Sequence, residues 1–541
     1  MLPFAARDHR RAFAALAALV LLTRLPGFLF GLVNIDECDF TILARALARG
    51  ERLYVDVADI KPPLAYLAFL PSGLAFDIWP MRVAGVLLVL GTALLARAAA
   101  RRWTGDERVG WCAAFASVLA GMVELPSVSA ELVMNLPAAA ALLLFVRARR
   151  EGRPGLDLAA GLCVGVASLV KHQAAVLDLG LGLALLWHAW DVAGEERRRT
   201  VRGFLLLAAG SVAPWLATAG WFAAAGRFAP FYDWVFARNF LYVSRLPGDA
   251  ALPRFVASFA ECILGATLVL WVLAAREAPG AVRAPDPVRR GLLLTLLLTW
   301  VPVSAGGRFY EHYFLQFAPP LAVLAAPGLA RLAEAWPALG RWRRAGLAAL
   351  LILPAVATTG YGFARGLLRD LPGQEPRSRE LAAWLRLHTA PEDRLFVWGH
   401  YSPIYYLAQR LPGTRYLTCS VHEGNFDPGH LPPGFDAAAH RSDRDVRATL
   451  EDLERNRPAI FVDTAPADIH HWSRVPLSAF PDLERYLRAH YAPVAAPGGA
   501  VVYRRRPEAP PADQGNSART TITEAAKPAA SASSAAGSAW R

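Results

Sequence analysis

The stretch Asn34–Tyr66, NIDECDFTILARALARGERLYVDVADIKPPLAY, is a polar island between apolar segments. It opens with the adjacent carboxylates Asp36 and Glu37 and closes on Lys61, which the rigid pair Pro62-Pro63 follows. Charged side chains beside a membrane are costly unless they face water, a partner or a substrate. The stretch therefore predicts a functional loop around which the apolar segments are arranged.

The composition indicates a membrane protein. Of 541 residues, 55% are hydrophobic, and the mean hydropathy is positive. Apolar runs long enough, or nearly so, to cross a hydrocarbon core of about 30 Å recur along the chain. Eleven spans are predicted, at about 12–33, 81–100, 109–130, 132–147, 156–170, 174–190, 203–225, 255–275, 291–304, 313–330 and 344–361.

The distribution of basic residues predicts how these spans are oriented, because short cytoplasmic loops collect arginine and lysine. Alternate loops on one side carry 23 arginines in 71 residues, whereas the loops on the other side carry 10 basic residues in 107. This predicts a cytoplasmic N-terminus, an odd number of spans and an extracytoplasmic C-terminal part. The net charge of +12 then reflects topology, and no nucleic-acid partner is expected.

The first span reads as a retained helix, since no small-residue cleavage pattern follows it. The five cysteines form no CxxC motif. Only Cys38 and Cys419 are expected in an oxidising compartment, and we do not expect a bridge between them. The heavy use of Ala, Arg, Gly and Pro is typical of a bacterium with a GC-rich genome, so the outer side would be the periplasm.

Within the loop 34–80, apolar residues recur at helical spacing from Phe40 to Ala48, which predicts an amphipathic helix lying on the outer membrane surface. Pro62-Pro63 can start a second short helix, Leu64 to Leu70, with Lys61 at its N-terminal edge.

From 362 to 507 the pattern changes to helix-then-strand units, which predict an extracytoplasmic α/β domain with a mainly parallel sheet and a final hairpin. The expected helices are 377–388, 401–410, 443–455 and 482–490. The Ala-, Ser- and Pro-rich tail 508–541 is expected to be disordered.

Several residues could carry chemistry. Lysine is rare: of 57 basic residues only Lys61, Lys171 and Lys527 are lysine, and the first two are placed at the outer membrane face. A compact ammonium binds a phosphate oxygen differently from a planar guanidinium, so these lysines suit a phosphate site, although chance and snorkelling explain them too. Arg308 with Lys61 could clamp a phosphate, or be a loop arginine at the interface. His312, beside Arg308 on one helical face, is equally well a structural histidine.

Asp36 could be a general base, particularly if burial raises its pKa. Alternatively, Asp36 and Glu37 only cap the helix that follows. Glu131, at the outer membrane edge, is either functional or paired with an arginine. No Walker loop, GxGxxG motif or HExxH motif is present. No cofactor is implied with certainty, but Asp36, Glu37 and Asp59 could hold a divalent metal ion.

Four motifs together resemble the GT-C fold glycosyltransferases, in the family 39-like group of protein O-mannosyltransferases, the lipid A aminoarabinose transferase and the RgtA/B/C/D-like transferases. They are the DE pair at Asp36, YVDVADIKPPL, GGRFYEHYFLQ and WGHYSPIYYLAQR, and the resemblance covers roughly 12–420.

The resemblance implies a polytopic enzyme of the inner (plasma) membrane that transfers a sugar, with inversion, from a polyprenyl-phosphate donor to a lipid, glycan or protein acceptor of the cell envelope. It implies that Asp36, in its pair with Glu37, is the catalytic carboxylate, that Lys61 approaches the donor phosphate, and that Glu131 is a second acid. The segment 308–313, which includes Tyr313, matches a phosphate-side position. The alternatives are a secondary transporter, although no internal repeat is visible, or a polymerase or ligase of lipid-linked glycans, which needs a large late loop.

Overall fold

The computed structural model describes residues 6–123, 126–240, 248–283, 285–424, 431 and 434–507. The described residues up to Arg505 form one compact unit. The predicted disorder of the tail 508–541 lies outside the described residues.

An apolar helix or helix set stands at each of the eleven predicted spans. They are α1 (Ala6–Leu29), α5 (Trp79–Thr104), α6 (Glu107–Ala120), α7 (Ala130–Glu151), α8 (Gly155–Val170), α9 (Ala175–Asp191), α10 (Gly194–Ala224), α13 (Gly248–Ser258) with η3 (Phe259–Gly265) and α14 (Leu268–Ala275), α16 (Pro287–Ser304), η4 (Glu311–Phe317) with α17 (Ala318–Ala335), and α18 (Arg341–Leu367).

Six of the described helices are long and apolar enough to cross a membrane by themselves, and seven if the pair Ala251–Gly265 and Leu268–Arg283, bent by 79°, counts as one broken span. Helices α6, α8 and α9 have 14, 16 and 17 residues, respectively. At about 1.5 Å per residue such helices fall short of a core of about 30 Å. The chain is thus a polytopic helical membrane protein, with the short helices packed among the longer ones.

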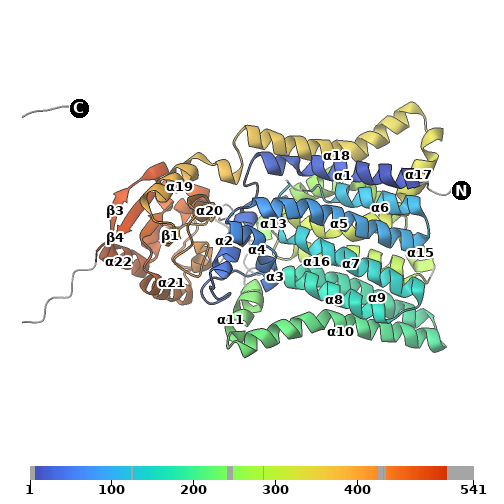
Figure 1. Ribbon diagram of the computed structural model, residues 1–541, viewed down its shortest axis with the longest axis horizontal. Helices are drawn as coiled ribbons and strands as arrows, with labels where there is room; N and C mark the ends of the chain where they lie inside the picture. Colours follow the sequence, from blue (N-terminus) through green and yellow to red (C-terminus); the bar gives the residue numbers. More distant parts are fainter. Residues whose placement is uncertain are drawn as a thin grey trace, which may run out of the picture. The chain divides into compact units, whose positions relative to one another are not determined.

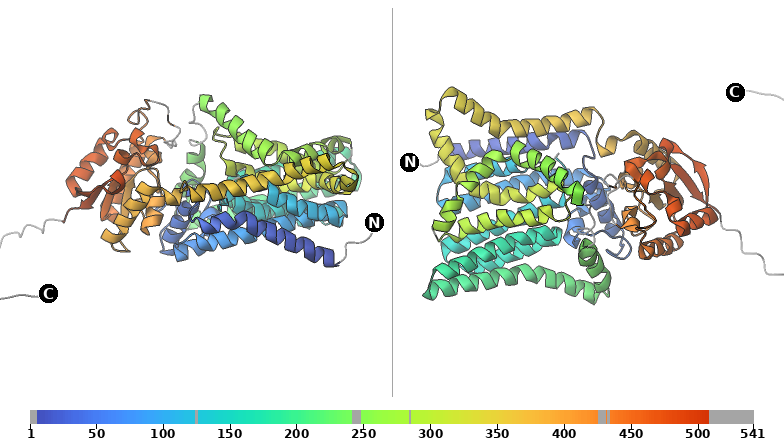
Figure 2. Two further views of the ribbon diagram at one scale, coloured as in Figure 1. Left: turned by 90° about the horizontal axis from the view of Figure 1, so that it is seen from above. Right: turned by 180° about the vertical axis from the view of Figure 1, so that it is seen from behind.

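The helices form a bundle with the α/β part at one end (Figure 1). Helix α1 starts at the end of the bundle far from the α/β part, and α18 packs along α1 in both figures that show the whole chain (Figure 2). Helices α2 (Ile35–Ala48), α3 (Pro63–Leu67) and α4 (Leu70–Ala75) lie between the bundle and the α/β part.

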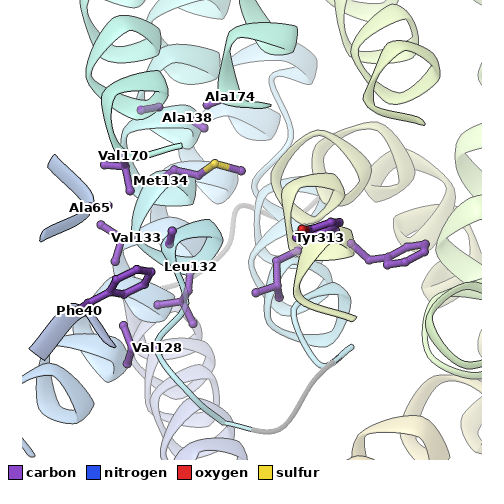
Figure 3. Close-up of a cluster of buried hydrophobic side chains, with 14 of the residues drawn as sticks. Phe40, Ala65, Val128, Leu132, Val133, Met134, Ala138, Val170, Ala174 and Tyr313 are labelled. Atoms are coloured by element: carbon purple, nitrogen blue, oxygen red, sulfur yellow. The ribbon is translucent and has the colours of Figure 1, made fainter. Parts of the chain in front are cut away.

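Helix α2 confirms the first helix predicted in the loop, and the side chain of Asn34 caps it by accepting from the backbone N–H of Asp36 at 3.0 Å. The second predicted helix is interrupted, because α3 ends at Leu67 and α4 begins at Leu70. The prediction that the apolar stripe of α2 faces the membrane surface is wrong. Phe40 and Leu43 are buried in the protein core, and Figure 3 shows Phe40 beside Ala65 of α3 and Val128.

The α/β part holds a four-stranded sheet of order β1-β2-β4-β3, with β1 (Leu395–Trp398), β2 (Ile460–Asp463), β3 (Tyr491–Ala495) and β4 (Val501–Arg505). Only β1 and β2 are parallel, and β4 runs antiparallel to both of its neighbours. The prediction of a mainly parallel sheet is therefore wrong: the short connection 496–500 closes β3 and β4 into the predicted hairpin, and a hairpin is antiparallel.

The helices of this part are α19 (Pro376–His388), α20 (Pro403–Ala408), α21 (Asp443–Asn456) and α22 (Pro481–His490), close to their predicted positions. All five cysteines are free, so Cys38 and Cys419 form no bridge. The α/β part is joined to the loop after α2: the backbone N–H of Ala58 donates to the carbonyl oxygen of Arg415 at 2.9 Å.

Candidate active site

A cleft of about 430 Å³ lies between the α/β part and the end of the bundle that faces it. Charged and aromatic side chains from both parts line it. They include Asp36, Asp39, Asp59, Lys61, Lys171, Arg308, Tyr310, Glu311, His312, Tyr313, Arg365, His400 and His470.

The structure brings together residues that are far apart in the sequence. Of the eight side chains predicted as site residues, six line this cleft: Asp36, Lys61, Lys171, Arg308, His312 and Tyr313. Glu37 and Glu131 are fully buried behind it.

Asp36 is held in place by the cap of α2 and remains an anion. Partial burial by itself raises the pKa of Asp36, but the charges of Lys61, His312 and Lys171 outweigh it and hold that pKa below its usual value. The idea that burial raises the pKa of Asp36 toward neutrality is therefore wrong. An ionised carboxylate that faces several cations can still accept a proton from a substrate hydroxyl.

Glu37 is engaged in a buried network. Its carboxylate pairs with Arg82, and its Oε1 accepts from the backbone N–H of Val128 at 2.7 Å. Arg82 also donates to the carbonyl oxygens of Gly27 and Gly31. The pair ties the start of α2 to α1 and α5, so we propose that Glu37 positions Asp36 and does not meet substrate.

The proposed metal ligands do not converge, because Glu37 is bound to Arg82 behind the cleft. Within the residues that the structure describes, no group of three or more His, Cys, Asp or Glu side chains could hold a metal ion.

Lys171 projects into the cleft from the end of α8 and is supported from behind. It donates to the buried carboxylate of Glu131, and its Nζ lies 4.4 Å from the centre of the Tyr313 ring. His312 Nε2 lies 4.0 Å from Glu131 Oε1. Glu131 thus orients two cleft residues and is the partner of a lysine, where the sequence suggested an arginine.

Lys61 is fixed by its backbone as well as its side chain. Tyr54 donates to the carbonyl oxygen of Lys61 at 2.7 Å, and the Lys61 N–H donates to the hydroxyl of Tyr66 at 3.0 Å. Its Nζ lies 3.6 Å from Asp59 and 5.0 Å from the centre of the Phe40 ring. The ammonium group is therefore held at the cleft by a carboxylate and an aromatic face.

Asp39 is a cleft residue that the sequence analysis missed. It follows Asp36 by three residues, so both lie on one face of α2. Burial, and then the charges of Asp36 and Asp59, raise the pKa of Asp39 to about 7, although a hydrogen bond with Ser402 opposes this. The spacing of three residues between Asp36 and Asp39 could have indicated that both face the cleft. It could not indicate the burial and neighbouring charges that raise the pKa of Asp39.

A second cavity of about 420 Å³ adjoins the cleft and shares Asn34, Glu311 and Arg365 with it. Its other walls come from the break at η3 and from α18, where Ala357 and Thr358 face it. The cleft is therefore continued along the side of the bundle.

No family model matches the chain, and no curated protein matches it by sequence. Solved structures do match. ArnT from Cupriavidus metallidurans bound to undecaprenyl phosphate shares 16% identity over 92% of this chain and 98% of its own, with a TM-score of 0.57. Archaeal oligosaccharyltransferase AglB from Archaeoglobus fulgidus, in complex with an inhibitory peptide and a dolichol-phosphate, shares 13% identity over 93% of this chain and 75% of its own, with a TM-score of 0.54. The chain therefore has the GT-C fold that the sequence motifs predicted.

Proposed function

We propose that this GT-C protein transfers a sugar, with inversion, from a polyprenyl-phosphate carrier to an acceptor hydroxyl or amine at the outer face of the membrane. One observation carries the proposal: an ionised carboxylate, Asp36, shares one cleft at the end of a membrane bundle with the cations Lys61, Lys171 and Arg308.

The chemistry needs these two kinds of group. Asp36 takes the proton of the acceptor while the acceptor heteroatom forms a bond to the anomeric carbon. The bond from that carbon to the phosphate oxygen breaks, and its electron pair leaves with the polyprenyl phosphate. Fixed cations stabilise the charge that develops on the phosphate, where preorganised electrostatics contribute most. Attack opposite to the leaving phosphate inverts the anomeric centre.

Lys61 and Arg308 are the proposed phosphate ligands, and Lys171 is a third cation held ready by Glu131. The adjoining cavity along α18 and η3 is a route for a lipid chain, since it leads from the cleft down the side of the bundle. The solved GT-C structures that carry undecaprenyl phosphate and a dolichol-phosphate support a lipid-phosphate donor of this general kind.

The proposed orientation follows from the arginine-rich loops. The N-terminus is cytoplasmic, and the cleft and the α/β part are extracytoplasmic, in the inner membrane of a bacterium. The start of α1 and the α/β part lie at opposite ends of the bundle, as this orientation requires (Figure 1). In this arrangement residues 1–361 form the transmembrane module, and residues 362–507 form a separate extracytoplasmic domain.

The test compares wild type with Asp36→Asn at matched expression in a deletion strain, using mass spectrometry of lipid extracts and surface glycans. We expect the variant to accumulate a polyprenyl-phospho-sugar and to lose one residue from a glycan or lipid, with transfer reduced by about 10²–10⁴-fold. The matched control is Asp482→Asn, an exposed carboxylate on α22. Lipids and glycans identical to wild type in Asp36→Asn would overturn the proposal and favour a transporter.

A further inference from the structure

The α/β part contributes its own side chains to the cleft, and they come from one place in its fold. His400 follows the end of β1 by two residues, and His470 belongs to the loop after β2. These two strands are the parallel pair of the sheet. Ligands of α/β sheets bind outside the carboxyl ends of parallel strands, which is the edge that meets the cleft here.

The two loops are built to stay close to each other. Thr464, after β2, donates its hydroxyl hydrogen to the carbonyl oxygen of Trp398 at 2.8 Å. Gly399 has no room for a Cβ, since that atom would lie 2.5 Å from the Thr464 hydroxyl oxygen. A glycine directly before His400 thus allows the two strand ends to touch.

The rings of the two loops form a column. His470 and His400 are stacked with their centres 5.6 Å apart and their planes at 22°. His400 in turn stacks on Trp472, at 6.3 Å and 14°. Trp472 is fully buried, whereas both histidines are partly exposed at the cleft. The column therefore runs from the core of the α/β part to the cleft and ends on His470.

The backbone that carries His470 is strained. Asp468, His470 and His471 have φ of 49°, 54° and 61°, in the left-handed region that non-glycine residues rarely adopt. The Asp468 carboxylate stabilises the loop by accepting from the N–H of Ser473 at 3.1 Å. Strained non-glycine residues persist where the surrounding structure enforces them, and they cluster at ligand sites.

We propose that the His400–His470 stack is the acceptor subsite of the cleft and that it takes a sugar ring. This rests on the proposed glycosyl transfer. An aromatic face packs on the C–H face of a pyranose, while imidazole nitrogens can hydrogen-bond to ring hydroxyls. Thr418 and Ser420 add hydroxyl groups to the same wall. The cations Lys61, Lys171 and Arg308 belong to the helical part, so the donor and acceptor subsites come from different parts of the fold.

The test uses the purified full-length chain in detergent micelles and saturation-transfer NMR, with a panel of methyl hexopyranosides and a blocked serine-containing peptide as probes. His470→Asn removes the ring but keeps a residue that tolerates the left-handed conformation. His471→Asn is the matched control, because it has the same backbone conformation but does not line the cleft. Binding of undecaprenyl phosphate is measured on the same samples.

We expect at least one glycoside to bind wild type and His471→Asn, and to bind His470→Asn about tenfold more weakly. Undecaprenyl phosphate should bind all three, which also shows that the variants are folded. Three results would each overturn the acceptor subsite. They are glycoside binding to His470→Asn as tight as to wild type, binding of the peptide but of no glycoside, and no glycoside binding to wild type. Failure of wild type to bind undecaprenyl phosphate would instead count against the proposed function, whatever the glycosides do.

Discussion

Asp36 and Asp39 are one helical turn apart on α2, yet their environments move their pKa values in opposite directions. Coulomb interactions with Lys61, His312 and Lys171 keep the pKa of Asp36 low, whereas the pKa of Asp39 rises to about 7 through burial and the charges of Asp36 and Asp59. When two carboxylates share a site and one is stabilised as an anion, the other tends to hold the proton. At neutral pH the pair therefore supplies one base and one carboxyl that titrates.

This difference predicts the effect of Asp39→Asn. Above about pH 7 the ionised Asp39 adds negative charge to the cleft and weakens binding of the donor phosphate, so the KM for the donor should rise with pH in wild type and stay flat in the variant. Besides Asp36 and Asp59, the groups that face Asp39 are Lys61, Ser402 and the Cys38 thiol.

Stability gives a second measurement of the same group. Because the folded protein holds a proton on Asp39 up to about pH 7 and the unfolded chain only to about pH 4, stability contributed by this group falls as pH rises through that window. Asp39→Asn should therefore raise the thermal midpoint more at about pH 8 than at about pH 5. Asp56→Asn, in the same loop and paired with Arg52, is the control. The prediction is contradicted if the KM for the donor and the thermal midpoint depend on pH in Asp39→Asn as they do in wild type.

At the scale of elements, the position of Asp36 depends on how α2 packs. Helix α2 crosses α4 at Gly73, where a Cβ would lie 2.5 Å from the carbonyl carbon of Ala44 and 2.6 Å from the nitrogen of Arg45. These are backbone atoms, so no side-chain rotation can relieve the contact. A glycine is thus required for the approach that holds α2 under the cleft.

Gly73→Ala should push α2 away from α4, reduce transfer through displacement of Asp36, and destabilise the protein by about 1–3 kcal/mol. Gly220→Ala in α10 is the matched control, since a Cβ there has no neighbouring atom within 4 Å. Thermal unfolding and lipid-linked sugar turnover of the two variants provide the measurement. If Gly73→Ala and Gly220→Ala have equal midpoints and equal turnover, the contact between α2 and α4 can accommodate a Cβ at position 73.

At the scale of the whole molecule, ion pairs join the bundle side to the α/β part. Arg238, after α10, pairs with Asp445 of α21 at 2.7 Å and with Asp233 at 3.0 Å. Burial alone would raise the pKa of Asp445, but bonds with Arg238, Ser442 and Tyr416 hold it below the usual value. Since cleft residues come from both sides, these pairs help to keep the site assembled.

Acid should weaken this junction. An aspartate with a lowered pKa in the folded state stabilises it above its unfolded pKa, and that contribution is lost as pH falls through the lower folded value, below about pH 4. Hydrogen exchange of the segment around Ala58, whose N–H bonds to Arg415 across the junction, reports on it. We expect faster exchange, corrected for intrinsic rates, below about pH 4 in wild type and already at neutral pH in Asp445→Asn. Asp482→Asn should behave as wild type. If neither acid pH nor Asp445→Asn changes the exchange rate at Ala58, the Arg238–Asp445 pair does not hold the junction together.

Much of the architecture could be predicted because it depends on local patterns. Helical hydrophobic periodicity from Phe40 to Ala48 predicted α2, and the helices of the α/β part lie near their predicted positions. The mainly parallel sheet was predicted wrongly because the order of helices and strands along the chain does not determine the position of the last strand in the sheet. Here β4 lies between β2 and β3 and is antiparallel to both. The stripe of α2 was assigned to the membrane surface because a sequence does not show whether lipid or protein covers an apolar face.

By itself, the sequence determined that the chain is a polytopic membrane protein of GT-C type, and it identified six side chains that line the cleft. Those features depend on composition, charge asymmetry and short motifs, which are properties of neighbouring residues. Only the tertiary structure decided that Glu37 and Glu131 lie behind the cleft, that Asp39 titrates near neutrality, and that His400 and His470 meet the cations of the bundle. Burial, Coulomb interactions and ring stacking often join residues tens or hundreds of positions apart, and only the folded chain brings them together.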